Sequence, residues 1–423
     1  MTAPSAQEPV RYIKNFYFFR YLVGDGLVSL EGRTWSRHRR ILQPCFQTGI
    51  LKEALTAAVP VKVNRLIEAW ERSEGRVIEV YAHMSAVTLD ILGEVSFAHD
   101  FRALDTIAKW ANSSDGAEEE IGEIQDPLIR SLSKIFKPNM VGVILGVMGM
   151  SWVQKYISKK SNETKRLLDE ATDDILQSAK KSENKKQSLI HIMLAAMQKD
   201  DSQGSRNSLT FQEMRDEMKF FIVAGHETTS TWCYWVLYAL GKHPDVQERV
   251  LDNIRKHAPT NGNKDGLITD LDAIAKMEYY LAFLQECLRL YSPAGMIFRY
   301  STRKDETFHG TAIPPKTRII VPIYILHRHP DYWMDPETFL PERWLDPKQI
   351  EMRHPFCFLP FSAGGRNCIG EKFARFEAQL ILVNLIRRFE IKLAPEIRHK
   401  ELELRSSLTV KSKPTVKIVV NSR

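Results

Sequence analysis

The pattern of apolar and polar positions divides the chain into a helical first part and a later part that contains short strands. Over residues 35–200 apolar side chains recur at helical spacing, interrupted by polar segments such as residues 182–187 and 200–208. Runs rich in Ile and Val, bounded by Pro or charged residues, predict strands over residues 318–325, 389–393 and 415–420. The pattern therefore predicts a mainly α protein with small β-sheets.

One predicted helix is unusually long and apolar. Residues 211–242 would form a helix of roughly 48 Å at 1.5 Å per residue. Its apolar run is interrupted by GHETT at residues 225–229, although Gly costs about 1 kcal/mol inside a helix. Threonine hydroxyls can bond back to the preceding turn and bend the helix. Polar groups in such a position need partners or a chemical role.

The chain contains no internal repeat and no long Gly, Ser or Pro linker, so we expect one domain over residues 1–423. Its first ten residues include no apolar run that could serve as a signal peptide or anchor. The longest uncharged apolar stretch, residues 140–153, would rise roughly 21 Å as a helix, against about 30 Å of hydrocarbon in a bilayer. It is too short to span a membrane, but it could lie on one or belong to the core.

Composition excludes a disordered protein, because 43% of residues are hydrophobic and 26% are charged. A net charge of +7 favours an anionic partner such as nucleic acid, a lipid surface or an acidic protein, or else reflects a solvated basic surface. The five cysteines form no C-x-x-C pair, and an odd number does not suit a disulfide framework. We expect a reducing compartment and mostly buried thiols.

The strongest chemical signal is the segment FSAGGRNCIG at residues 361–370, which a helical pattern follows directly. A lone cysteine is usually a small buried hydrophobe. Here three glycines let the backbone turn tightly against a flat ligand, and Cys368 lies at a helix start, where unpaired N–H groups and the helix dipole favour a thiolate. Such a thiolate is the ligand that pushes electron density onto haem iron.

This segment resembles the haem-binding loop of the cytochrome P450 family, F-x-x-G-x-R-x-C-x-G. Its fixed positions are occupied by Phe361, Gly364, Arg366, Cys368 and Gly370. The resemblance implies the cytochrome P450 fold and a haem b that is held without covalent bonds except for the ligation of its iron by Cys368. It also implies that Phe361 packs against this ligand and that Arg366 points toward a haem propionate.

The central helix carries a second family motif, because AGHETT at residues 224–229 resembles the oxygen-activation motif A/G-G-x-D/E-T-T/S. A carboxylate beside a hydroxyl can relay protons to dioxygen, so we expect catalytic roles for Glu227 and Thr228. By resemblance Gly225 leaves room for O2. Ala224 stands where some fatty-acid omega-hydroxylases of the family carry a Glu that esterifies the haem, so we expect no such ester here.

Further motifs follow in the order of the family. Glu286 and Arg289 resemble its E-x-x-R, and the PERW segment at residues 341–344 resembles its P-E-R-F element with Trp in place of Phe. Three-residue spacing puts Glu286 and Arg289 on one helix face, although such pairs are common in ordinary helices. The resemblance implies that Arg343 joins them in a buried network.

Trp35 and Arg39 resemble the family motif W-x-x-x-R, and their spacing puts both side chains on one helix face. Indole and guanidinium groups are hydrogen-bond donors that suit a carboxylate. The resemblance implies that both residues bind a haem propionate and that Arg299 binds a propionate too. A surface arginine remains the alternative for Arg299.

The resemblance implies a monooxygenase that inserts one oxygen atom from O2 into a lipophilic substrate, such as a fatty acid, sterol, terpenoid or xenobiotic. Two electrons would come from an NADPH-cytochrome reductase or a ferredoxin-type donor. The family places the following positions above the haem: Phe220, Phe221, Ala224, residues 294–298, Ser407 and Leu408. Two alternatives stay open, a haem-thiolate isomerase or dehydratase, against which Thr228 argues, and an inactive truncated haem-binding protein. No motif supports a nucleic-acid partner.

The resemblance begins near residue 10, whereas the W-x-x-x-R helix of the family usually follows a long N-terminal portion. We therefore expect that the chain lacks the anchor, first helix and first strands of the family. By resemblance it would act at the cytosolic face of the endoplasmic reticulum membrane, as a peripheral or soluble protein that contacts the membrane surface.

Overall fold

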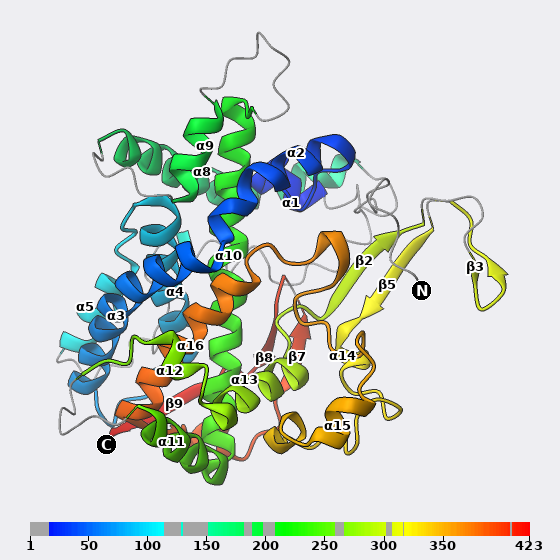
Figure 1. The fold of residues 1–423 in the computed structure, drawn as a ribbon. Coiled ribbons are helices and arrows are strands. Elements are labelled where there is room, and N and C mark those ends of the chain that lie inside the picture. The colour runs from blue at the N-terminus through cyan, green and yellow to red at the C-terminus, as the bar shows by residue number, and fades with distance from the viewer. Residues whose placement is uncertain are drawn as a thin grey trace.

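The computed structural model describes residues 17–113, 128–129, 151–181, 188–197, 208–258, 266–301, 307–315, 317–406 and 408–423. These residues are mostly helical and carry small antiparallel sheets, as the sequence predicts (Figure 1). The predicted polar loop at residues 182–187, most of residues 200–208 and most of the apolar stretch 140–153 lie outside the described residues. Those three predictions therefore stay predictions.

Helices account for most of the described chain. In chain order they are α1 (Tyr17–Val23), α2 (Gly32–Leu42), α3 (Thr48–Arg72), α4 (Val80–Phe97), α5 (Ala103–Asn112), α8 (Ser151–Lys181), α9 (Leu189–Met197), α10 (Phe211–Lys242), α11 (Pro244–His257), α12 (Leu271–Ile274), α13 (Glu278–Leu290), α14 (Ile323–Leu326), α15 (Pro347–Met352), α16 (Glu371–Arg388) and α17 (Pro395–Arg398). Short 3-10 turns include η1 (Gln43–Phe46), η3 (Pro341–Trp344) and η4 (Gly364–Arg366).

The long helix α10 runs through the middle of the molecule (Figure 1). Thr210 caps its start by accepting a hydrogen bond from the Glu213 N–H, while the Glu213 side chain accepts one from the Thr210 N–H. Its end is set by His243 and by Pro244, which begins α11. The predicted bounds are confirmed, because both ends carry local sequence signals.

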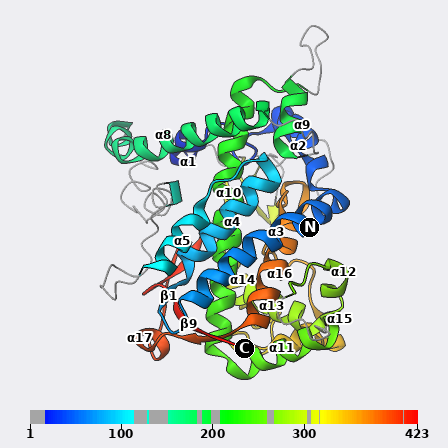
Figure 2. The ribbon, with the colours of Figure 1, turned by 90° about the vertical axis from the view of Figure 1, so that its left-hand side faces the viewer.

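Other helices pack around α10 and bury most of its surface. Figure 2 shows α3 and α4 on one side of it, and α4, α8, α9, α13 and α16 all contact it. Its apolar side chains, among them Trp232, Trp235 and Tyr234, belong to one continuous core with those of α3, α4 and α16. The polar residues of its middle turns are therefore held in the interior of the fold.

The described residues contain four small antiparallel sheets. The strands are β1 (Ile78–Glu79), β2 (Met296–Tyr300), β3 (Thr307–Phe308), β4 (Thr311–Ala312), β5 (Arg318–Pro322), β6 (Phe389–Leu393), β7 (Glu403–Ser406), β8 (Val410–Lys413) and β9 (Lys417–Ser422). β9 lies between β1 and β6, and the remaining strands form the pairs β2–β5, β3–β4 and β7–β8.

The three predicted strands are found, but two of them have different ends. β6 has the predicted bounds. β5 stops at Pro322 and α14 follows, so the strand prediction for residues 323–325 is wrong; Pro has no N–H for the ladder. β9 covers Lys417–Ser422, so it begins and ends two residues later than predicted. Before its start the Val416 N–H donates to the Tyr234 hydroxyl at 2.9 Å and is not free for strand pairing.

Among the described residues, no helix is both long and apolar enough to cross a membrane. The prediction of one domain over residues 1–423 is not tested by these features.

Candidate active site

The segment around Cys368 is a tight loop that closes on itself before α16 begins. The Cys368 N–H donates to the Phe361 carbonyl at 2.9 Å, and the Asn367 N–H donates to the Gly364 carbonyl at 3.0 Å. Gly364 has φ +78°, a left-handed conformation that favours glycine. A Cβ on Gly364 or Gly365 would meet nothing within 4 Å, so this side of the loop is open. The loop presents its cysteine next to an open face.

Cys368 differs from the other cysteines in its exposure. Its thiol is exposed, whereas Cys45, Cys233, Cys287 and Cys357 are free and buried. The prediction of mostly buried thiols is confirmed. An exposed cysteine held by a backbone loop is available for a ligand, and the buried ones are not.

The pKa of the Cys368 thiol is raised, not lowered, in the protein alone. The side chain reaches solvent through the open face but is crowded by protein atoms on its other sides, and this burial is the main cause. The Gly370 N–H and the charge of Arg39 oppose it, while Glu371 adds to it. The expectation that the helix start makes the free thiol acidic is therefore wrong, because desolvation outweighs the helix terminus.

Helix α2 brings two predicted residues to this loop. Arg39 donates to the carbonyl oxygen and to the side-chain oxygen of Asn367, both at 3.0 Å. The Arg366 guanidinium lies 3.9 Å from the ring centroid of Trp35 and donates to the Leu30 carbonyl at 2.9 Å. The spacing of Trp35 and Arg39 thus places both against the residues next to Cys368.

Arg299 and Phe361 also lie at the loop. Arg299, on β2, donates to the Ser362 hydroxyl at 2.7 Å. The Phe361 ring lies 6.2 Å from the ring of Trp232 on α10, edge to face. All the predicted residues of the loop and of its flanks are therefore brought together, and Phe361 and Trp232 link the loop to the central helix.

The middle of α10 has an accessible strip on an otherwise buried helix. Thr228 is exposed, and Ala224 and Gly225 are partly exposed. Thr228 lies one turn before Trp232, which contacts the loop, so the strip shares the helix face that is turned toward it. A Cβ on Gly225 would come within 2.9 Å of the Leu92 side chain, so this glycine lets α4 approach closely. This packing contact does not test the expected room for O2 at Gly225, which stays a prediction.

Glu227 and Thr228 are neighbours in sequence but make separate contacts. The Thr228 hydroxyl donates to the Ala224 carbonyl at 2.9 Å. The buried Glu227 carboxylate accepts hydrogen bonds from Tyr81 and from Thr409, the latter at 2.8 Å, and forms an ion pair with Lys411 at 2.9 Å. These three partners could not be predicted from the sequence, since nothing in their local sequence relates them to residue 227.

Away from the loop, the predicted network around Glu286 is present and fully buried. One carboxylate oxygen of Glu286 accepts from Arg289 at 2.8 Å and from Arg343 at 3.0 Å, and the other accepts from Arg289 and from the Trp344 indole, both at 2.9 Å. All three charged side chains are inaccessible to solvent. The E-x-x-R pair is therefore structural here, and Trp344 contributes a hydrogen bond that Phe could not.

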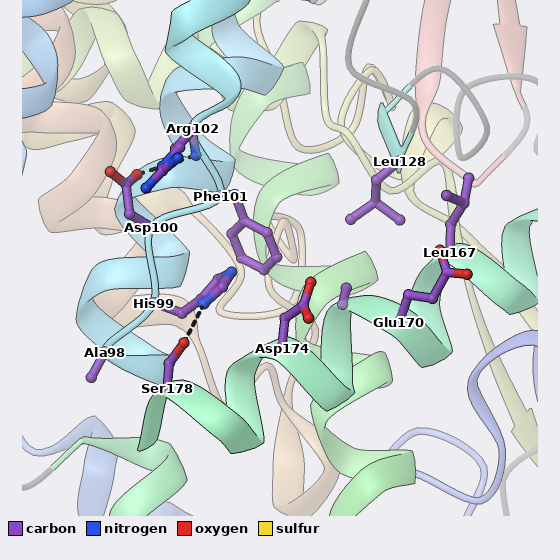
Figure 3. Close-up of a pocket in the computed structure, with 11 residues that line it drawn as sticks. Ala98, His99, Asp100, Phe101, Arg102, Leu128, Leu167, Glu170, Asp174 and Ser178 are labelled. Atoms are coloured by element: carbon purple, nitrogen blue, oxygen red, sulfur yellow. Dashed lines mark hydrogen bonds between the residues drawn. The ribbon is translucent and has the colours of Figure 1, made fainter. Parts of the chain in front are cut away.

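A pocket of about 540 Å³ lies outside this site (Figure 3). It lies between the turn that joins α4 to α5 and the helix α8, and His99 and Ser178 hydrogen-bond across it at 3.1 Å. Its lining consists of Ala98, His99, Asp100, Phe101, Arg102, Leu128, Leu167, Glu170, Ala171, Asp174 and Ser178. None of these residues belongs to the motifs around Cys368 or Thr228, so the pocket is separate from the candidate active site.

Comparisons with known proteins agree with the geometry. Residues 4–419 match the sequence model of the family described as Cytochrome P450. The chain is 30% identical over 383 residues to Cytochrome P450 4Z1 of Homo sapiens, which covers 88% of this chain and 71% of that protein. It is also 30% identical over 395 residues to Leukotriene-B4 omega-hydroxylase 3 of Mus musculus, which covers 90% and 71%. The chain belongs to the cytochrome P450 family.

Membership of the family defines the activity and the cofactor. The protein is a haem-dependent monooxygenase, an oxidoreductase that inserts one oxygen atom from O2 into a lipophilic substrate with electrons from an external reductase. Members of the family bind haem b and ligate its iron with a cysteine thiolate. The comparisons lend no support to an isomerase, a dehydratase or an inactive haem-binding protein.

The residues present fit a haem between the Cys368 loop and α10. The exposed thiol would supply a soft ligand for the iron, and the open side of the glycine loop would leave space for a flat group. Arg39 and Arg299 contact residues of this loop and Arg366 belongs to it, so positive charge gathers where a propionate would need it. The accessible strip of α10 faces the same region.

Proposed function

We propose that Cys368 is the residue whose sulfur would ligate the haem iron. The observation that carries this assignment is an exposed thiol, on a glycine loop, facing the accessible strip of α10. Coordination deprotonates a thiol outright, so the raised pKa of the free Cys368 thiol does not oppose ligation. When bound, the haem supplies the activation of O2 that protein side chains cannot provide. The role of the loop is then to hold the sulfur in one position.

For the haem propionates we propose Trp35, Arg39, Arg299 and Arg366 as binding residues. Their contacts with Asn367, Ser362 and each other support this assignment, because they hold the donors at the loop before a carboxylate arrives. Guanidinium groups pair well with carboxylates, and a pre-positioned donor loses less side-chain entropy on binding. Phe361 packs between the loop and Trp232, and we propose that it shields the sulfur from water.

On α10 we propose that Glu227 and Thr228 deliver protons and that Gly225 shapes the O2 site. The exposed Thr228 hydroxyl is the polar group of the accessible strip, so it can hold a proton near the bound substrate and O2. The buried carboxylate of the neighbouring residue, Glu227, would be the acid that resupplies this proton. The two residues would act in series.

A fatty-acid-like substrate, hydroxylated near its chain end, is the class we propose. One relative is named a leukotriene-B4 omega-hydroxylase, and the positions toward the accessible strip include the apolar Phe220, Phe221 and Ala224. Ala224 cannot form an ester with the haem, so the haem is held by its iron ligand and by non-covalent contacts. Ser407, another position expected near the substrate, lies outside the described residues.

As for its surroundings, we propose that residues 1–423 act as one catalytic domain at the cytosolic face of the endoplasmic reticulum. There it would contact the membrane surface and accept electrons from an NADPH-cytochrome reductase. The supporting features are the basic net charge and the family's need for an external electron donor. A ferredoxin-type donor is the alternative, and reconstitution with each donor would distinguish the two by the rate of haem reduction.

Thr228→Ala tests the proposed oxygen side of the site. We expect substrate binding to be retained, measured by the spin-state change of the haem spectrum, while product formed per NADPH falls by roughly tenfold or more and peroxide release rises. Thr56→Ala is a matched control, since Thr56 also donates to the carbonyl four residues earlier on a helix, that of Lys52. If Thr228→Ala forms as much product per NADPH as the parent protein, Thr228 takes no part in the reaction.

The substrate class is tested with a panel of ligands. Long-chain fatty acids and a leukotriene should shift the haem spin state at lower concentration than a sterol or a terpenoid of similar size. Product analysis should then find the hydroxyl group near the chain end. A spectral response to sterols alone would contradict the proposed class while leaving the assignment of Cys368 intact.

A further inference from the structure

The Glu227 carboxylate is held on the side of α10 that faces α4 and the β7–β8 hairpin. Its Oε1 atom accepts from the Thr409 hydroxyl at 2.8 Å and lies 2.9 Å from the Lys411 Nζ atom, and its Oε2 atom accepts from the Tyr81 hydroxyl. Thr228, the next residue, is turned to the accessible strip. The carboxylate therefore has a set of contacts of its own, on a different face of the helix from the strip.

Lys411 is the member of this set that reaches solvent. Its side chain is 23% exposed, whereas Glu227 is 2% exposed. The ammonium nitrogen lies 3.4 Å from the centroid of the Tyr81 ring, so the ring covers one side of the ion pair. The β7–β8 register places Lys411 opposite Arg405 on the neighbouring strand. Solvent thus approaches Glu227 along the Lys411 side chain, from the hairpin.

The charges around Glu227 keep it ionised in a buried position. Burial opposes ionisation, but Lys411 and then His226 outweigh it, so the pKa of Glu227 lies below its ordinary value. Burial and the Glu227 charge together raise the pKa of Tyr81 well above its ordinary value, so Tyr81 stays neutral and donates. Among the described residues, Glu79 is a further charged group beside the set, and it lies near both Tyr81 and Lys411.

We propose that Lys411 is a positioning residue for proton delivery, which holds the Glu227 carboxylate turned toward the β7–β8 hairpin, so that protons enter the site from solvent on that side. The proposal rests on the proposed role of Glu227. In the step concerned, a hydronium ion or buffer acid at the hairpin gives its proton to a Glu227 oxygen, an O–H bond forms, and water or the buffer base is left. No electrons move in this step, and Tyr81 and Thr409 keep the carboxylate in place.

Lys411→Met is the informative variant, and Lys411→Arg is its rescue because it restores the charge. Without the ammonium group the pKa of Glu227 should rise, which infrared titration of the carboxyl band can detect when spectra of Glu227→Gln are subtracted. We expect product per NADPH in Lys411→Met to fall by roughly tenfold and its solvent isotope effect to change, with both restored in Lys411→Arg. The reduced, CO-treated spectrum should stay the same in all these variants, which shows that they fold and bind haem.

Lys413→Met is the matched control, since Lys413 is an exposed lysine two residues along the same strand. It should leave both the carboxyl band and coupling unchanged. One outcome would overturn this proposal but keep the role of Glu227. In that outcome product per NADPH falls in Glu227→Gln, whereas Lys411→Met keeps the product per NADPH of the parent protein and an unshifted carboxyl band. Normal coupling in Glu227→Gln would instead overturn the proposed function of Glu227 itself.

Discussion

Glu377 places an ionisable carboxyl group in the interior, between α16 and α10. It is fully buried, and within the described part of the chain neither carboxyl oxygen makes a hydrogen bond. The nearby Thr229 hydroxyl donates instead to the Gly225 carbonyl, at 3.3 Å. Burial therefore raises the pKa of Glu377 well above its ordinary value, against a weaker opposing effect of Thr229.

Replacing this carboxyl group should stabilise the protein. Below the unfolded pKa of about 4.3, Glu377 is protonated in both states. As the pH rises above that value only the unfolded state loses the proton readily, so the native state loses stability. We expect Glu377→Met to raise the free energy of unfolding by about 1–3 kcal/mol at neutral pH, and by less near pH 4, in urea denaturation.

Glu371→Gln, on the same helix, is the control, because Glu371 is partly exposed and pairs with Arg375. Exposed ion pairs contribute little to the free energy of unfolding, so Glu371→Gln should show no increase in that free energy that grows with pH. A Glu377→Met protein as stable as the parent at every pH would mean that Glu377 has partners that the described residues do not reveal.

Sequence motifs identified the residues around Cys368 but not the partners of Glu227. Trp35, Arg39 and Cys368 could be predicted because each belongs to a short motif with fixed spacing. Tyr81 and Lys411 lie far from Glu227 in sequence, and only the packing of α4 and of the β7–β8 hairpin on α10 brings them together. The raised pKa of the Cys368 thiol could not be predicted either, since it depends on burial.

Helix α13 is joined to the loop before η3 by the buried Glu286 network. Arg289 also donates to the carbonyl oxygens of His327, Pro336 and Thr338, and Arg343 donates to that of Met334 at 2.7 Å. One carboxylate thus balances two buried guanidinium groups that hold several loop carbonyls. Removing it leaves two charges in the interior without compensation.

Glu286→Ala should lower the free energy of unfolding by about 3–5 kcal/mol, because breaking a buried ion pair from one side leaves its partner uncompensated. Thermal unfolding and haem retention would both report the loss. Glu337→Ala is the control: Glu337 is exposed and pairs with Arg328, so about 1 kcal/mol or less is expected. Similar effects of the two substitutions would show that the Glu286 network does not stabilise the fold.

The ends of helices and strands could be predicted from the sequence where the residues that set them lie close to those ends. The bounds of α10 follow from Thr210, Glu213 and Pro244, all within a few residues of its ends. The start of β9 could not be predicted, because it depends on the Tyr234 hydroxyl of α10, which takes the Val416 N–H. Short strands such as β1 have too few residues to show an alternating pattern.

The basic surface of the molecule bears on the approach of an electron donor. Of the basic residues near the Cys368 loop, Arg37 pairs with Glu213 and Arg375 pairs with Glu371, which reduces their net field. Lys372 is exposed and donates to the neutral Thr48 hydroxyl at 2.8 Å, so its charge is not cancelled by that contact. It is therefore the side chain we expect to matter most for an acidic partner.

Lys372→Glu should slow the reduction of the haem by an acidic flavoprotein at low salt. The difference from the parent should shrink at high salt, because the Debye length falls from about 10 Å at 0.1 M to about 3 Å at 1 M. Lys165→Glu on α8 is a control of equal charge change. If both substitutions change the rate of haem reduction equally, net charge alone guides the partner. If the rate does not depend on salt, no charge guides it.

The assignment of Cys368 as the iron ligand is the centre of this account, and the spectrum of the reduced, CO-treated protein tests it most directly. Cys368→Ser keeps the size of the side chain but removes the thiolate, while Cys357→Ser alters a buried cysteine four residues before Phe361. The account predicts that Cys368→Ser loses the red-shifted Soret band that a thiolate ligand gives, and that Cys357→Ser keeps it. A red-shifted band that persists in Cys368→Ser would contradict the assignment.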